Sequence, residues 1–169
     1  MRRVITPITF ALALASLASA QTPNAADPAA LEAGLVRAMR PSADRTERLV
    51  EPGDAIRAYI AAGIVPVKPD LREEYTDYRV VRQPAKLFGQ ELMVIEEEYQ
   101  LKFIGCCVNA GVGAILRVTG DQAPLNEFAA ANGCSLSKDD VIERLRKLKV
   151  KSLTGEFVSL SCRERDLMK

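Results

Sequence analysis

The stretch MVIEEEYQLKF, residues 93–103, carries the clearest structural pattern of the chain. Apolar and polar residues alternate along it, which is the pattern of a β-strand with one buried face. The residues expected on the apolar face are Met93, Ile95, Tyr99, Leu101 and Phe103. The opposite face is expected to carry Val94, Glu96, Glu98, Gln100 and Lys102. Only Glu97 interrupts the apolar face, so we expect a bulge or a bend between two strands at that position.

Turn residues follow this stretch, and the next apolar run predicts the returning strand of a hairpin. The turn covers residues 109–111 and the returning strand residues 114–119. Further short strands are expected over 78–81 and 156–161. Helices are expected over 27–40, 52–62, 124–131 and 137–149, the last with Ser137 as its N-cap. The sequence therefore predicts an α+β fold, with a small antiparallel sheet around a central hairpin, packed against helices and braced by disulfides.

Residues 1–20 have the three parts of a cleavable signal peptide. Arg2 and Arg3 form the basic start, residues 4–17 are mostly apolar, and small residues precede a cut predicted between Ala20 and Gln21. The apolar run is shorter than the roughly 20 residues that span a bilayer. We therefore expect removal of the leader and a periplasmic or secreted protein of the bacterial envelope. An uncleaved N-terminal anchor is the alternative.

After cleavage, we expect residues 21–26 to be a flexible N-terminus and residues 27–169 to form one soluble globular domain. The whole chain has 23 Lys and Arg against 22 Asp and Glu, and Arg2 and Arg3 would leave with the leader. The mature charge is therefore close to zero, which favours neither nucleic acid nor an anionic membrane as a partner. No membrane span is expected after cleavage.

All four cysteines lie in the second half of the chain: Cys106, Cys107, Cys134 and Cys162. An even number of cysteines in an exported protein favours disulfides. Neighbouring side chains on a strand point to opposite faces, so Cys106 and Cys107 are expected to find different partners. We favour Cys107 with Cys134 and Cys106 with Cys162, although the sequence leaves all three connectivities open. A vicinal redox pair is the alternative, but the chain has no Cys-x-x-Cys motif.

The chain contains no histidine. This excludes Ser-His-Asp triads, Cys-His dyads and histidine-containing zinc sites, and no motif for a metal or cofactor is present. Glu96 and Glu98 are the remaining catalytic candidates, because on one strand face they would stand roughly 7 Å apart, a spacing that carboxylate glycosidases use. Consecutive glutamates on a strand more often form a hydrated surface.

The absence of a complete catalytic set in the sequence favours binding over catalysis. We therefore expect a periplasmic, non-enzymatic protein-binding factor, such as an inhibitor or immunity-type protein acting on a cell-envelope enzyme or toxin. Its partner would be another envelope or secreted protein. The alternatives are a carboxylate-dependent hydrolase of envelope polysaccharide and a structural component of an envelope complex. A cleft with two converging carboxylates would favour the hydrolase, and an exposed apolar patch would favour protein binding.

Overall fold

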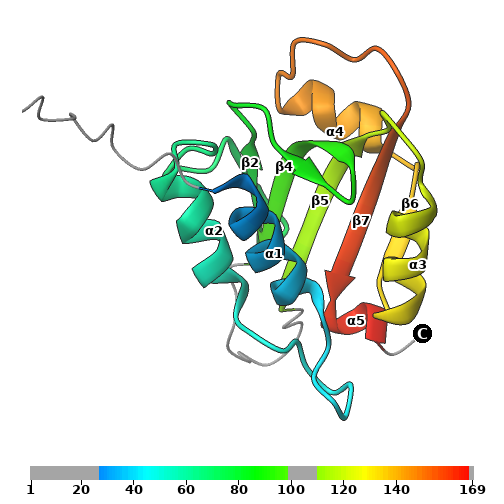
Figure 1. Cartoon of the computed structure of the whole chain (residues 1–169). Coiled ribbons are helices and arrows are strands. Elements are labelled where there is room, and N and C mark those ends of the chain that lie inside the picture. Colours follow the sequence, from blue (N-terminus) through cyan, green and yellow to red (C-terminus); the bar gives the residue numbers. More distant parts are fainter. Residues whose placement is uncertain (1–26, 99–109, 168–169) are drawn as a thin grey trace, which may run out of the picture.

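An antiparallel sheet organises the part of the chain that the computed structural model describes, residues 27–98 and 110–167 (Figure 1). The strands are β1 (Leu71–Glu73), β2 (Thr76–Val80), β3 (Lys86–Leu87), β4 (Gln90–Glu98), β5 (Gly111–Arg117), β6 (Ser135–Ser137) and β7 (Phe157–Arg163). Their order across the sheet is β1-β2-β4-β5-β7-β6, with β3 also pairing with β4. The helices are α1 (Pro28–Met39), α2 (Pro52–Ala61), α3 (Ala123–Ala131), α4 (Val141–Lys147) and α5 (Glu164–Leu167). The fold is α+β, as predicted.

The predicted central hairpin corresponds to β4 and β5, which pair with Ile95 opposite Ala114. β4 runs without interruption through Glu97, so the predicted break at that residue is wrong. The irregularity lies between Leu92 and Val94 instead. Because it adds one residue to β4, Leu92 and Ile95 both join the core under α1 and α2, while Val94 joins the core on the opposite face.

Two other sequence predictions need correction in this region. Gly111 begins β5 rather than closing a turn, and a Cβ at this position would lie 2.4 Å from the carbonyl oxygen of Cys162. Ser137 belongs to β6 rather than capping a helix, because β6 pairs with β7. The helix predicted over 137–149 starts only after Asp140, which adopts a left-handed φ of 56°. Tyr99, Leu101 and Phe103 lie outside the described residues.

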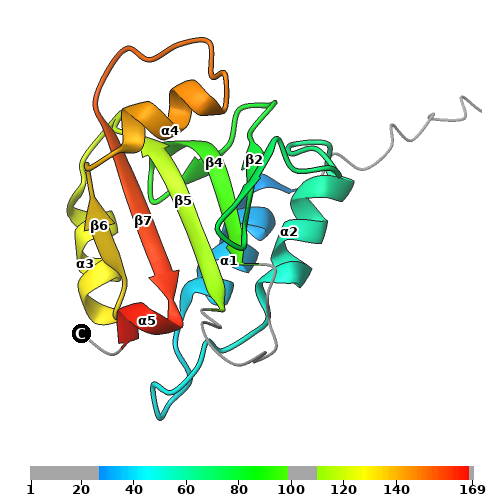
Figure 2. The same cartoon turned by 180° about the vertical axis from the view of Figure 1, so that it is seen from behind.

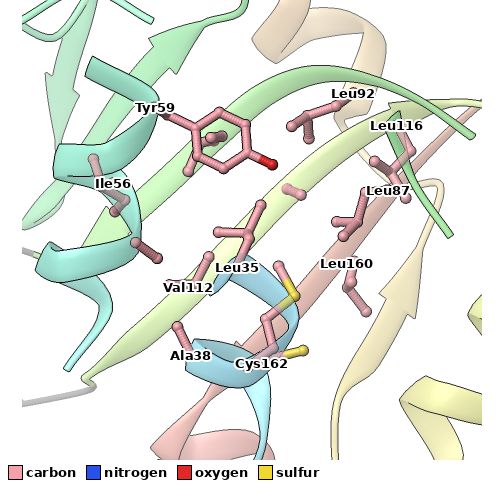
Figure 3. Packing of buried hydrophobic residues seen from close by; sticks show 14 of the residues in the cluster. Leu35, Ala38, Ile56, Tyr59, Leu87, Leu92, Val112, Leu116, Leu160 and Cys162 are labelled. Carbon is pink, nitrogen blue, oxygen red and sulfur yellow. The ribbon is translucent and has the colours of Figure 1, made fainter. Parts of the chain in front are cut away.

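The helices divide between the two faces of the sheet. Helices α1 and α2 lie side by side over one face (Figure 1), and α4 lies over one end of the other face (Figure 2). The core under α1 and α2 includes Leu35, Tyr59, Leu92, Leu116 and Leu160 together with other buried apolar residues (Figure 3). The core under α4 is smaller and is centred on Val94, Ile115 and Leu145. No helix among residues 27–98 and 110–167 has the length and apolar character that a membrane crossing requires.

A disulfide joins Cys134, after α3, to Cys162 of β7. This corrects the favoured connectivity, in which each of these two cysteines pairs with one of the vicinal pair. The physical reason is the sheet: β6 and β7 are neighbours, which brings the two Cα atoms to 4.4 Å. Cys106 and Cys107 lie outside the described residues, as do Ala20 and Gln21.

Arg48 lies next to this disulfide and hydrogen-bonds to several backbone carbonyls. Its guanidinium is buried and donates hydrogen bonds to the carbonyl oxygens of Met39 at 2.8 Å, Asn132 at 3.0 Å and Arg163 at 2.6 Å. These carbonyls belong to the ends of α1, α3 and β7, where helix and strand termini leave acceptors unpaired. Burial is the main effect that lowers the pKa of Arg48. One side chain therefore connects the C-terminal ends of α1, α3 and β7.

Candidate functional site

The face of the sheet under α4 carries a buried group of charges, Glu96, Arg144, Arg163 and Asp166, which we call the Glu96 cluster. Glu96 lies on β4 and is 1% exposed. Its Oε2 accepts a hydrogen bond from Nη2 of Arg163 at 3.0 Å, and its Oε1 accepts one from Nη1 of Arg144 at 3.4 Å. Both carboxylate oxygens are thus engaged by guanidinium groups, and neither is left to approach a substrate.

Asp166 fixes the other side of this cluster. Its Oδ2 accepts hydrogen bonds from the backbone N–H of Arg163 at 2.9 Å and from the hydroxyl of Ser161 at 2.7 Å. Its Oδ1 accepts one from the hydroxyl of Ser135 at 2.8 Å. Because these donors come from β7 and β6, Asp166 joins α5 to the sheet and holds Arg163 in place for Glu96.

Gly113 makes room for Glu96 on the neighbouring strand. A Cβ at Gly113 would lie 2.7 Å from Oε2 of Glu96 and 3.2 Å from the carbonyl oxygen of Leu160. The first distance is shorter than van der Waals contact allows, so any larger residue would displace the carboxylate. The absence of a side chain at Gly113 therefore leaves room for the ion pair of Glu96 with Arg163.

Glu98 lies on the same face as Glu96 and is also buried, at 4% exposure. The hydrated surface expected for these two glutamates is therefore not observed. The nearest polar recess, about 250 Å³, lies between β1, β2 and α4 and is lined by Glu73, Glu74, Tyr78, Asp140, Glu143, Arg144 and Lys147. Neither Glu96 nor Glu98 lines it. The cluster thus resembles a structural ion network more than the acid and base of a hydrolase.

Glu97 points to the opposite face of β4 from its two neighbours. Its Oε2 lies 3.5 Å from Nη2 of Arg79, which also approaches Asp77 at 3.4 Å. Burial raises the pKa of Glu97, and the charge of Arg79 opposes that rise. Glu96 and Glu97 therefore occupy two separate ionic environments, one on each face of the sheet.

A hollow of about 640 Å³, which we call the α1 hollow, lies where the start of α1 meets the segment before β4. Its lining residues are Pro28, Ala29, Leu31, Glu32, Tyr59, Ile64, Pro84, Ala85, Lys86, Gly89, Glu91 and Thr119. The walls are mainly aliphatic, and a few polar groups interrupt them. This composition and size are typical of sites that hold a small molecule or a side chain of a partner.

Two polar side chains in the α1 hollow stand close enough to influence one another. Tyr59 is 1% exposed, and burial, followed by the charge of Glu32, raises the pKa of Tyr59 to about 12. Figure 3 shows its ring packed among the core residues with the hydroxyl pointing away from α2. This hydroxyl has no hydrogen-bond partner among the described residues. Glu32 accepts a hydrogen bond at Oε1 from the backbone N–H of Phe88 at 2.7 Å.

The α1 hollow was not predicted from the sequence. Tyr59 lies between the apolar residues of the helix predicted over 52–62, and Glu32 lies beside the apolar residues Leu31 and Leu35, in both cases without any distinguishing motif. The two come together because α1 packs against α2, a contact that local periodicity does not specify. Among residues 27–98 and 110–167, no group of three or more acidic or cysteine side chains is placed to hold a metal ion.

Comparisons with protein-family models, with curated proteins and with solved structures found no match to this chain. The geometry of the Glu96 cluster and of the α1 hollow is therefore the basis for a functional proposal.

Proposed function

We propose that this chain is an exported, non-enzymatic binding protein whose partner is another protein of the cell envelope, in the manner of an inhibitor or immunity protein. The α1 hollow carries the proposal. Protein interfaces gain most of their binding energy from a few side chains that fill well-packed pockets. A hollow with aliphatic walls on a rigid helix and sheet framework offers such a pocket.

The exposed apolar side chains are too scattered to form a flat docking surface, which favours the hollow as the docking site. The large ones among the described residues are Leu49, Val67 and Tyr75. They lie in three different loops, and single exposed apolar residues are common on monomeric proteins. Since they form no continuous patch in sequence or topology, the concave site is the better candidate.

Two further observations support the proposal. The Cys134–Cys162 disulfide is of the kind that persists in oxidising compartments, which agrees with export through the predicted leader. The pairing of Glu96 with Arg163 and Arg144 argues against the hydrolase alternative, because a glycosidase needs two carboxyl groups that face one cleft.

A filled hollow tests the proposal. Ala29 is exposed and lines the hollow, so Ala29→Trp should fill it without disturbing the core. Ala130 is also exposed on a helix but does not line the hollow, which makes Ala130→Trp the matched control. Wild type and both variants are used to capture proteins from an envelope extract. Each captured protein is then purified and titrated by calorimetry.

We expect at least about a tenfold loss of affinity for Ala29→Trp and none for Ala130→Trp, since filling a hot-spot pocket costs more than about 1 kcal/mol. The proposal is wrong if the wild-type protein captures no partner while Glu96→Gln abolishes a glycan-cleaving activity. It also loses its basis if a purified partner binds Ala29→Trp as tightly as the wild type.

A further inference from the structure

The α1 hollow contains an acid without a cation. Glu32 receives one hydrogen bond, from the backbone of Phe88 to Oε1, and no ion pair among the described residues. The other acid of the lining, Glu91, is already paired, because its Oε2 lies 2.9 Å from Nη1 of Arg117. Lys86, the lining cation, is exposed and forms no ion pair with Glu32. The negative charge of Glu32 is therefore available to a bound group.

The hydroxyl of Tyr59 offers a second acceptor in the same hollow. Tyr59 lines the hollow, its hydroxyl forms no hydrogen bond with another residue of 27–98 or 110–167, and the charge of Glu32 reaches it electrostatically. A donor that enters the hollow can therefore hydrogen-bond to this oxygen without displacing a partner from the described residues. A phenol is neutral at physiological pH, and burial with the charge of Glu32 raises the pKa of Tyr59 further, to about 12, so its oxygen accepts a hydrogen bond while its proton remains.

We infer that the α1 hollow receives an aliphatic side chain that ends in a primary ammonium, as in a lysine of the partner protein. This rests on the proposed function and adds the chemistry of the docking group. The four-carbon stem of lysine would lie against Leu31, Ile64 and Pro84, since lysine stems commonly cover apolar surface. The ammonium would donate to Glu32 and to the hydroxyl of Tyr59.

Lysine fits this pair of acceptors better than arginine. A guanidinium is recognised best by both oxygens of one carboxylate in a planar, two-bond arrangement. In this hollow, Oε1 of Glu32 is already engaged by the backbone of Phe88. An ammonium has three donors that need not lie in one plane, so it can use the remaining oxygen of Glu32 together with a hydroxyl. A carboxylate ligand would meet the charge of Glu32 and be repelled.

The first test uses three probes of equal chain length: n-hexylamine, 1-hexanol and hexanoate. The mature protein is titrated with each, and the backbone amide of Phe88 is followed by NMR because it donates to Glu32. We expect saturable shifts with hexylamine and at least about tenfold weaker binding of hexanoate, with hexanol between them, as a charge-assisted hydrogen bond predicts. Equal binding of hexylamine and hexanoate would overturn the inference.

Two variants then assign the preference to its residues. Glu32→Gln keeps an oxygen acceptor for the backbone of Phe88 and removes the charge, so it should abolish the preference for hexylamine over hexanol. Tyr59→Phe keeps the ring and removes the second acceptor, and we expect about a threefold loss of hexylamine affinity. Glu127→Gln is the matched control, because Glu127 is an exposed residue of α3 outside the hollow. Thermal melts check that each variant is folded.

The inference and the proposed function fail in different ways. If Ala29→Trp prevents partner capture but Glu32→Gln binds the partner as tightly as the wild type, docking in the hollow stands and the ammonium inference is wrong. If hexylamine is preferred and Glu32→Gln abolishes that preference, the inference holds for the hollow. If a partner then binds Ala29→Trp as tightly as the wild type, only the proposal that the α1 hollow is the protein-docking site is overturned.

Discussion

The face of the sheet under α1 and α2 is buried largely by apolar side chains, whereas the face under α4 is buried partly by charged ones. On the first face, Leu116 and Leu160 are completely buried among other aliphatic residues. On the second face, the aliphatic core stops near Val94 and Ile115, and Glu96 and Arg163 continue the buried surface. The same strands therefore support one core built mainly from aliphatic side chains, with the Glu97, Arg79 and Asp77 charges beside it, and another in which charges continue the buried surface.

The largest effect should come from removing one partner of the charged core. Arg163→Met leaves Glu96 buried with only the longer contact to Arg144, and breaking a buried ion pair costs about 3–5 kcal/mol. Urea denaturation at pH 7 measures the loss of stability. The double variant Glu96→Met/Arg163→Met should recover most of it, because a well-packed apolar pair often replaces a buried ion pair without loss. A single variant as stable as the wild type would contradict the charged-core interpretation.

Removal of the disulfide tests how much this bond stabilises the core under α1 and α2. Cys134 and Cys162 are separated by 28 residues, and closing such a loop stabilises a protein by about 3.5 kcal/mol in the chain-entropy model. Cys134→Ala/Cys162→Ala should lower the free energy of unfolding by about that amount. Calorimetric melts with and without a reductant make the measurement. Two losses of stability are then compared: the loss that the reductant causes in the wild type and the loss that the double substitution causes without reductant. If the first is much larger, disulfides other than Cys134–Cys162 contribute to stability.

A pair of glycine substitutions compares the crowded strand face with an open helix surface. Gly113→Ala should cost about 1–3 kcal/mol, since the new methyl group would overlap Oε2 of Glu96. Gly34→Ala should instead stabilise by about 0.5–1 kcal/mol, because Gly34 lies inside α1 with no atom near the position of its Cβ. Thermal denaturation of both variants gives the two signs. The same sign for both would show that packing against Glu96 does not determine the effect.

The sequence predicted those elements that local periodicity specifies. The span of α1 follows from the apolar spacing and from Pro28 at the first helical position, and the structure shows a helix over Pro28–Met39. The pairing of β4 with β5 likewise follows from the alternation in one strand and the apolar run of the next. These features depend on residues close together in the chain, so a single sequence contains the necessary information.

Features that depend on contacts between distant segments were missed or misplaced. The Cys134–Cys162 bond follows from the pairing of β6 with β7, and β6 was not predicted, since its last residue, Ser137, was assigned to a helix. The burial of Glu96 depends on Arg163, which lies 67 residues further along the chain. Alternation places Glu96 on a face, but it does not reveal that the face is covered by a helix and supplied with guanidinium groups.

The smallest predicted effect concerns Glu97, which faces away from the Glu96 cluster. Burial raises its pKa in the folded state above the ordinary value, and the charge of Arg79 only partly opposes this. A carboxyl group of this kind contributes stability that is fully present below its unfolded pKa and is lost as the pH rises through the folded pKa. Glu97→Gln keeps the shape without ionising, so it should be slightly more stable than the wild type at pH 7, by less than about 1 kcal/mol.

Urea midpoints of the wild type and Glu97→Gln should converge as the pH falls below the ordinary glutamate range, while Glu127→Gln follows the wild type throughout. A variant less stable than the wild type at pH 7 would mean that the attraction between Glu97 and Arg79 outweighs the cost of burial, and both faces of β4 would then depend on ion pairs.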